Sequence, residues 1–395
     1  MLSQRARNIT PSATCELEGT VAALKAKGVD VISFNIGEPD FHTPESIKDA
    51  CKRALDENKT TYVDIAGVPP LRQAICDKLW RDNHVSYKPE QICVSTGAKQ
   101  AINNAVIALT NPGDEDIIPI PGWVSYVEIV KLAGCVPVCV ETREDYQLDI
   151  PAIEAAITPK TKAILLNTPN NPTGAVYTRE SLEHLVMLAE SYDFYIISDE
   201  IYERLVYGEN RHVCVASLSP EAYRRTIVIN GLSKTYCMTG WRIGYSAAPL
   251  ELARGLKDIQ GHMTSNSTTF VQYAAIEALN NSEESIREMV SAFEVRRQYA
   301  YSRLCAMEGI VCRDVGGAFY LLPDVSYYYG RKARGKVIRD SFDLCNFLLE
   351  AYQVAMVPGG AFLSPNTVRV AYTVSMDEIR EGMDRIEQAL QELKP

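Results

Sequence analysis

The sequence predicts a two-domain α/β protein whose larger part is built on a mostly parallel sheet. The chain has 395 residues, and single hydrophobic cores stop growing at about 250 to 300 residues, so two domains are expected. From residue 90 onward, short β-branched runs alternate with longer segments of helical periodicity, which is typical of successive βα units. A hydrophobic content of 46% with 23% charged residues allows sizeable cores.

Seven short apolar runs are the candidate strands of this sheet. They cover residues 91–95, 116–120, 136–140, 163–167, 194–198, 226–229 and 244–248. Between them, apolar residues recur at helical spacing over residues 98–109 and 182–189. The alternation therefore predicts strands joined by helical crossovers.

The pattern changes after about residue 282. A long, charged, amphipathic helix is expected through Arg303, and it is followed by GGAFYLLPDV and by alternating helix and strand signals. We therefore expect a large domain over residues 46–282 and a smaller α/β domain over residues 283–395.

Charge and cysteine usage exclude several classes of function. A formal net charge of -10 argues against binding to nucleic acid or to an anionic membrane surface, which needs clustered positive charge. No apolar run approaches the roughly 20 residues of a membrane helix, and the N-terminal residues lack the apolar core of a signal peptide. The 11 cysteines form no Cys-x-x-Cys pair, so we expect neither a disulfide framework nor a metal site, and a cytoplasmic location.

Chemistry is expected where the parallel strands end. The first candidate strand runs into Thr-Gly-Ala-Lys and then into a helix, so the backbone N–H groups of Gly97, Ala98 and Lys99 could bind an anion such as phosphate. A tight strand-to-helix turn also needs glycine for its backbone alone, which is the structural alternative.

Two later strands also end in polar residues. Asn171, in NTPNNPTG, could donate to a ring oxygen or simply belong to a turn. Asp199 ends its strand, with Tyr202 close behind, and a carboxylate at the mouth of a sheet needs a partner unless it caps a helix.

Ser233, Lys234 and Arg242 follow the sixth candidate strand within ten residues of one another. A lone lysine is usually a solvated side chain. Together, the three fit the attachment of a phosphorylated aldehyde, with Lys234 as covalent partner and Ser233 and Arg242 holding the phosphate.

Seven strings carry a resemblance to a known family. They are FNIGEPDFHTP, STGAKQA, PGWVSYVE, NTPNNPTGAVY, ISDEIYE, SKTYCMTGWRIGY and VRVAY. In order and spacing they are similar to the motifs of class I aminotransferases, particularly the bacterial aspartate aminotransferase subgroup, from about residue 10 to beyond 380. The resemblance implies the fold of type I enzymes that depend on pyridoxal 5′-phosphate (PLP). That fold has a mainly parallel seven-stranded sheet and a small domain that residues 1–45 join.

The resemblance implies a role for each cofactor-binding residue. Lys234 holds PLP as a Schiff base and moves a proton during catalysis, and Asp199 faces the pyridine nitrogen. Tyr202 and Asn171 donate to the ring hydroxyl oxygen, and Trp123 stacks on the ring unless it is only a core aromatic. The phosphate is held by the residues of the strand-to-helix turn and of the lysine motif, namely Gly97, Ala98, Lys99, Ser233 and Arg242.

The resemblance also implies how substrate and subunits bind. Arg369 takes the substrate α-carboxylate in a two-pronged fork, helped by Gly37, Trp123 and Asn171. Tyr62 reaches the phosphate bound to the neighbouring subunit, so the enzyme is expected to be a homodimer with shared sites. For the substrate side chain the candidates are Ser12 and Thr14, which also fit a helix cap and a loop.

The expected reaction is amino transfer between an L-amino acid, with aspartate favoured, and 2-oxoglutarate by a ping-pong mechanism. A PLP β-lyase or decarboxylase on the same fold is the alternative, since the fold does not determine which Cα bond breaks. Aromatic amino acids, alanine and prephenate-type donors also stay open. A protein that only binds the cofactor is disfavoured, because all the expected catalytic residues are present.

Overall fold

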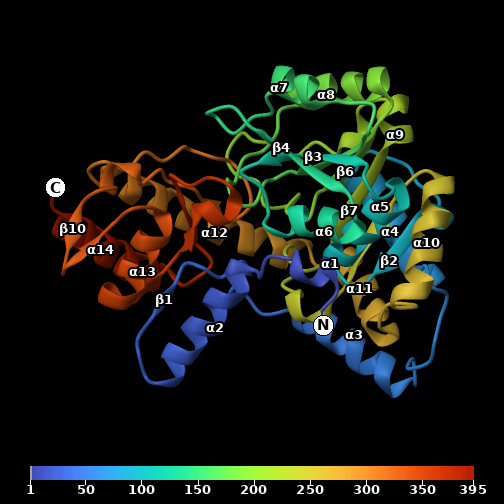
Figure 1. The fold of residues 1–395 in the computed structure, drawn as a ribbon. Helices are drawn as coiled ribbons and strands as arrows, with labels where there is room; N and C mark the ends of the chain where they lie inside the picture. Colours follow the sequence, from blue (N-terminus) through green and yellow to red (C-terminus); the bar gives the residue numbers. More distant parts are fainter. Residues whose placement is uncertain (1) are drawn as a thin grey trace.

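The computed structural model describes residues 2–395 and contains one central sheet of seven strands in the order β2-β8-β7-β6-β5-β3-β4 (Figure 1). All neighbours pair in parallel except β8, which runs antiparallel to both β2 and β7. The strands are β2 (Ile92–Ser95), β3 (Glu115–Ile120), β4 (Val136–Glu141), β5 (Thr161–Asn167), β6 (Tyr195–Asp199), β7 (Thr226–Gly231) and β8 (Gly244–Ala247).

The predicted sheet is confirmed, with each strand end within two residues of its expected place. Gln91 differs from the prediction in its type of secondary structure, because it ends the 3-10 helix η1 (Pro89–Gln91) and does not start β2. Pro89 lacks an N–H and suits the first turn of a helix better than a strand.

Helices cover both faces of the sheet. Consecutive strand residues point to opposite faces, so Ile196 packs in the cluster beneath α7 and α8 while Ile197 packs in the one beneath α5, α6 and α10. The helices of this part are α3 (Glu45–Asp56), α4 (Pro69–Asn83), α5 (Ala98–Leu109), α6 (Ser125–Ala133), α7 (Ile150–Ala156), α8 (Arg179–Tyr192), α9 (Pro220–Arg225), α10 (Leu250–Met263) and α11 (Thr269–Asn281). The helices expected over 98–109 and 182–189 are α5 and the middle of α8.

The C-terminal third forms a second layered region, shown in orange and red in Figure 1. The long helix expected after residue 282 is α12, and the region also holds the antiparallel sheet β13-β14-β9. Its elements are α12 (Glu283–Ala306), β9 (Tyr320–Leu321), β10 (Lys332–Ala333), β11 (Lys336–Val337), α13 (Ser341–Tyr352), β12 (Val354–Ala355), β13 (Val357–Pro358), β14 (Val368–Ala371) and α14 (Met376–Glu392).

The N-terminal segment lies against this region. Strand β1 (Ile32–Ser33) pairs in parallel with β12, and α2 (Ala13–Ala26) packs Val21 against Leu349 and Ala355. A short helix, α1 (Gln4–Arg7), precedes α2. The division into residues 1–45, 46–282 and 283–395 stays a prediction, since one hydrophobic cluster joins Tyr207 of the large part to Phe293 and Tyr372.

Two further sequence predictions concern the whole chain. No helix within residues 2–395 is long and apolar enough to cross a membrane. All eleven cysteines are free thiols, while the cytoplasmic location stays a prediction.

Asp116, in β3, is a buried carboxyl group without partners. It is 0% exposed, and neither carboxyl oxygen has a hydrogen-bond partner among the described residues. Burial, assisted by nearby Asp114, raises its pKa from 3.8 to about 7. The folded protein therefore favours the protonated form of Asp116 more strongly than the unfolded chain does.

This difference predicts a pH-dependent stability that one substitution removes. Because the folded pKa lies above the unfolded one, the contribution of Asp116 is fully present below about pH 4 and is lost as pH rises through about 7. Asp116→Asn should abolish this loss, which amounts to roughly 4 kcal/mol at most. The measurement is the thermal midpoint at pH 5 and pH 8, with exposed Asp258→Asn as control. Equal pH slopes for wild type and Asp116→Asn would contradict the prediction.

Candidate active site

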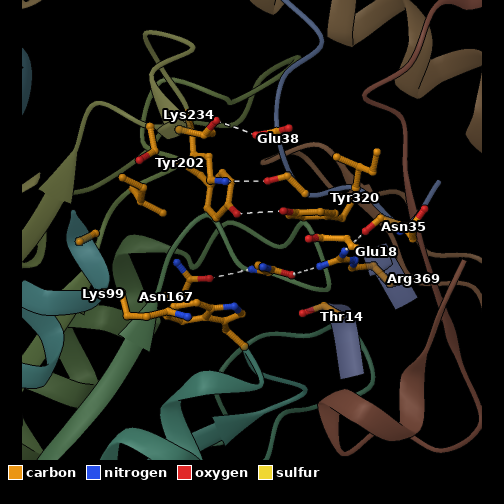
Figure 2. Close-up of a pocket in the computed structure, with 18 of the residues that line it drawn as sticks. Thr14, Glu18, Asn35, Glu38, Lys99, Asn167, Tyr202, Lys234, Tyr320 and Arg369 are labelled. Atoms are coloured by element: carbon orange, nitrogen blue, oxygen red, sulfur yellow. Dashed lines mark hydrogen bonds between the residues drawn. The ribbon is translucent and has the colours of Figure 1, made fainter. Parts of the chain in front are cut away.

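A cavity of about 570 Å³ lies at the carboxyl ends of β5, β6 and β7, between the large sheet, the C-terminal region and α2 (Figure 2). The expected site residues converge on it from distant parts of the chain. Those that line it are Gly37, Ala98, Lys99, Trp123, Asn171, Asp199, Tyr202, Ser233, Lys234, Arg242 and Arg369. Gly97 and Tyr62 are not among the lining residues.

Lys234 stands in the turn after β7, and its side chain is half-buried. Its Nζ donates to the backbone oxygen of Gly37 at 2.6 Å. Burial lowers the pKa of Lys234 to about 8; Arg369 and Arg242 act in the same direction, and Glu38 opposes them. About a tenth of the Lys234 amine is therefore unprotonated at pH 7, roughly 300 times more than for an ordinary lysine. An unprotonated amine is the form that a nucleophile or a proton acceptor requires.

Asp199, at the end of β6, is buried and held by hydrogen bonds. The Tyr126 hydroxyl donates to its Oδ2 at 2.7 Å, and the Ile201 N–H donates to its Oδ1 at 3.2 Å. Burial raises the pKa of Asp199 to about 6, although both hydrogen bonds favour the carboxylate. No helix begins here, so the alternative reading as a helix cap is wrong.

Tyr202 lies three residues after Asp199. It pairs with Tyr320, a residue that the sequence did not single out. Its hydroxyl lies 2.9 Å from the hydroxyl of Tyr320, and the two rings meet edge to face. Tyr126 is the other missed aromatic. Tyr126 and Tyr320 stand inside quoted strings, PGWVSYVE and GGAFYLLPDV, but nothing in those strings reveals their partners.

Arg369, in β14, is only 3% exposed. Its Nη1 donates to Asn171 Oδ1 at 3.0 Å and its Nη2 to the backbone oxygen of Asn35 at 2.8 Å. The guanidinium carbon lies 4.5 Å from the centroid of the Tyr320 ring. Its Nε is buried and has no acceptor within residues 2–395, so this guanidinium group still has an unused donor. Figure 2 shows Arg369 and Asn35 on the same side of the cavity.

The start of α5 offers free backbone donors. Ala98 and Lys99 are its first residues, and the first N–H groups of a helix have no partner within it. The N–H of Gly97 donates to the Ser95 backbone oxygen at 2.8 Å, and its predicted contact to a phosphate stays a prediction. Gly97 also provides room for Arg242, since a Cβ there would lie 2.5 Å from Arg242 Nη2. Ser233, which is buried, completes this corner.

Lys99 also presents its side chain to the cavity. Its ammonium group lies 4.8 Å from the centroid of the Trp123 ring, and burial lowers the pKa of Lys99. Trp123 is partly exposed to the cavity and packs edge to face on Tyr126. The alternative of a fully buried core tryptophan is therefore wrong.

One face of α2 forms the cavity's outer wall. Thr14, Glu18 and Lys25 line it, and Ser12 does not, although its hydroxyl lies 3.0 Å from that of Thr14. Sequence reasoning missed Glu18 and Lys25, whose spacing of four and eleven residues from Thr14 is a helical one.

Tyr62 lies on the surface and is 89% exposed. It therefore contributes nothing to the cavity of its own chain, and its predicted role depends on a second subunit.

Comparison with known proteins identifies the family. The family described as aminotransferase class I and II matches residues 29–386. This chain belongs to the class I and II aminotransferases. An aspartate aminotransferase of Bacillus sp. (strain YM-2) is 44% identical over 389 residues, 98% of each chain. An aspartate/prephenate aminotransferase of Cereibacter sphaeroides is 44% identical over 391 residues, again 98% of each.

Solved aminotransferase structures share the fold. The aspartate aminotransferase from Rhizobium meliloti superimposes with a TM-score of 0.96 at 37% identity, with full coverage of both chains. The one from Thermus thermophilus, solved with maleate, gives 0.93 at 40% identity, covering 98% of this chain and 99% of that one. The aminotransferase is thus a PLP-dependent enzyme of fold type I, as its sequence predicts.

The residues around the cavity of this aminotransferase fit PLP. The free N–H groups of Ala98 and Lys99 and the guanidinium group of Arg242 suit a phosphate. Lys234 supplies an amine of lowered pKa, and buried Asp199 supplies a carboxyl group suited to a ring nitrogen. The individual contacts to the cofactor stay predictions.

The lowered pKa of Lys234 predicts how cofactor loading depends on pH. Only an unprotonated amine attacks a carbonyl carbon, so the rate at which apoenzyme binds PLP covalently should rise about tenfold per pH unit below about 8 and level off above it. Borohydride trapping followed by peptide mass spectrometry measures the rate and locates the lysine. Nα-Acetyl-lysine, whose free ε-amine has an ordinary pKa, is the control, and its rate of reaction with PLP should keep rising to about pH 10. If the rate for the enzyme also rises to about pH 10, or if the adduct lies on another lysine, the assignment of Lys234 is wrong.

Proposed function

We propose that the enzyme is an aspartate aminotransferase that moves the amino group of L-aspartate to 2-oxoglutarate. The observation that carries the proposal is a set of three cationic side chains around one cavity: Arg242 beside the start of α5, Arg369 on β14, and Lys99 over Trp123. A cofactor phosphate, a substrate α-carboxylate and a side-chain carboxylate would each have a counter-charge. Aspartate and 2-oxoglutarate both carry two carboxylates, so one pocket suits both halves of a ping-pong reaction.

In this proposal Arg369 binds the α-carboxylate. Its side chain is buried, and Asn171 and Asn35 hold two of its nitrogens, so the guanidinium plane is positioned before substrate arrives. The backbone N–H of Gly37 and the side chains of Asn171 and Trp123 complete the predicted contacts. A bidentate fork suits a planar carboxylate.

Lys234 moves the proton at the substrate Cα. PLP, when bound, supplies an electron sink for the Cα carbanion and carries the amino group between half-reactions. Asp199 holds the charge of the ring nitrogen, and Tyr202 donates to the ring hydroxyl oxygen. Because Asp199 and Tyr202 are buried, their interactions with the ring act more strongly than they would in solution.

The names of the relatives point the same way, since both are called aspartate or aspartate/prephenate aminotransferases. The direct test is a titration of the holoenzyme with single amino acids, read from the absorbance of the bound cofactor. Aspartate and glutamate should convert it at the lowest concentrations. Release of pyruvate and ammonia when no 2-oxo acid acceptor is added would show a β-lyase instead. A preference for alanine or aromatic donors would exclude aspartate as the main substrate.

Two substitutions should separate the carboxylate sites. Arg369→Lys should lower kcat/KM for every donor, since all share the α-carboxylate. The decrease should correspond to a loss of about 2 to 4 kcal/mol in transition-state stabilisation. Lys99→Gln should cost roughly 2 kcal/mol for aspartate and little for phenylalanine. The measurement is kcat/KM for both donors in both variants, with the cofactor spectrum as control. An equal loss for both donors in Lys99→Gln would mean that Lys99 does not bind the side chain.

We also propose a homodimer in which Tyr62 binds the phosphate in the partner's site. The high exposure of Tyr62 in the single chain supports this. A hybrid dimer of one Lys234→Ala and one Tyr62→Phe subunit should then hold one intact site, with cofactor affinity like wild type and about half its activity. Sedimentation checks the assembly. A fully active monomer, or a hybrid with the weaker cofactor binding of Tyr62→Phe, would contradict the proposal.

A further inference from the structure

The turn that follows β6 has two sides. Asp199 and Tyr202 line the cavity, whereas Glu200 and Glu203, which directly follow them in the chain, do not. Both glutamates are nevertheless buried, and Glu200 is 0% exposed. Residues 200–204 belong to no helix or strand, so side-chain contacts contribute strongly to where this turn sits.

Glu203 joins the turn to α4 through a buried network. Lys78, which is 1% exposed, forms an ion pair with Glu203, and its Nζ also donates to Asn83 Oδ1 at 2.7 Å. Asn83 Nδ2 donates to the second oxygen of Glu203 at 2.7 Å. Burial alone would raise the pKa of Glu203, but Lys78 and His212 hold it at about 2. The carboxylate is thus charged and satisfied on both oxygens.

Glu200 binds the other end of the turn. Its Oε1 accepts from the Ser198 hydroxyl at 2.9 Å and from the Val215 N–H at 3.2 Å, and its Oε2 lies 3.0 Å from His212 Nε2. Its own backbone N–H donates to the Ile229 oxygen of β7 at 2.9 Å. Both glutamates therefore attach the turn to neighbouring elements on the side away from the cavity.

Glu200, Glu203 and His212 also lie close enough together to suggest a cation site. Lys78 already provides the positive charge for Glu203, and a metal ion would have to displace it. The geometry therefore favours a structural clamp over a metal site.

We propose that Glu203 and Lys78 are positioning residues that set where the Tyr202 hydroxyl and the Asp199 carboxylate meet the cofactor ring. The inference rests on the proposed roles of Asp199 and Tyr202. A buried ion pair adds little net stability compared with apolar residues of the same size, but its directional hydrogen bonds specify one arrangement. Glu203 directly follows Tyr202, so a shift of its carboxylate relative to α4 moves the Tyr202 backbone with it.

Glu203→Gln is the first test, made on the holoenzyme. A displacement of about 1 Å in a catalytic group can reduce turnover by up to about a hundredfold. We expect kcat to fall about tenfold or more, KM to change little, and the pH midpoint of the cofactor absorbance to shift as Asp199 moves. Glu209→Gln, an exposed substitution in the segment just after the turn, is the matched control and should change none of these.

A double-mutant cycle with Tyr202→Phe tests the link to Tyr202. If Glu203 acts through Tyr202, adding Glu203→Gln to Tyr202→Phe should cause less further loss than it causes alone. Fully additive losses would overturn the proposal. If Tyr202→Phe itself leaves activity and spectrum unchanged, the proposed role of Tyr202 fails, which is a distinguishable result.

The variant Lys78→Met/Asn83→Leu/Glu203→Leu replaces the whole buried network, so that no polar partner is left unpaired. It separates positioning from stability, and it carries the test if Glu203→Gln does not fold. Three apolar side chains should restore the thermal midpoint but not the directional hydrogen bonds. We expect a stable enzyme that keeps the low kcat and the shifted absorbance midpoint. If kcat and the absorbance midpoint both return to their wild-type values along with stability, the pair only supports folding and the proposal is wrong.

Discussion

The register of three parallel strands determines where the active site of this aminotransferase can form. Asn167 at the end of β5 lies opposite Asp199 at the end of β6, and Asp199 lies opposite Ile229 of β7. Parallel strands end at one edge of a sheet, so the turns that follow them share a single mouth. A slip of one residue in β6 would point Asp199 to the opposite face of the sheet. The turn that carries Lys234 depends on the same alignment, since it follows β7 directly.

Burial at this edge changes the two main titrating groups in opposite directions. The pKa of Lys234 falls to about 8 and that of Asp199 rises to about 6, because desolvation disfavours the charged form of each. Both groups therefore titrate near neutral pH, where a proton carrier is most effective. Burial also raises the pKa of Asp116, which does not line the cavity, and there the shift makes the stability of the fold sensitive to pH.

The site also needs a second wall, which comes from distant segments. Arg369 of β14 is held by Asn171, which follows β5, and by Asn35 near the N-terminus. These contacts join residues 198 and 334 positions apart, so Arg369 is held in this place, as its proposed role requires, only when the two regions are packed together. On the far side of the Asp199 turn, Lys78 and Glu203 make a similar long-range connection, over 125 positions.

Much of the fold and of the cavity lining follows from the sequence, because the signals are local. Alternating apolar runs predict the seven strands, and polar residues just past strand ends predict Asp199 and Lys234, since strand geometry depends on near neighbours. Only the tertiary structure decided that Tyr126 supports Asp199, that Tyr320 pairs with Tyr202, and that Glu18 faces the cavity. It also decided that the N–H of Gly97 binds Ser95. Such contacts depend on the packing of elements far apart in the chain, and no local pattern encodes which side chains then meet.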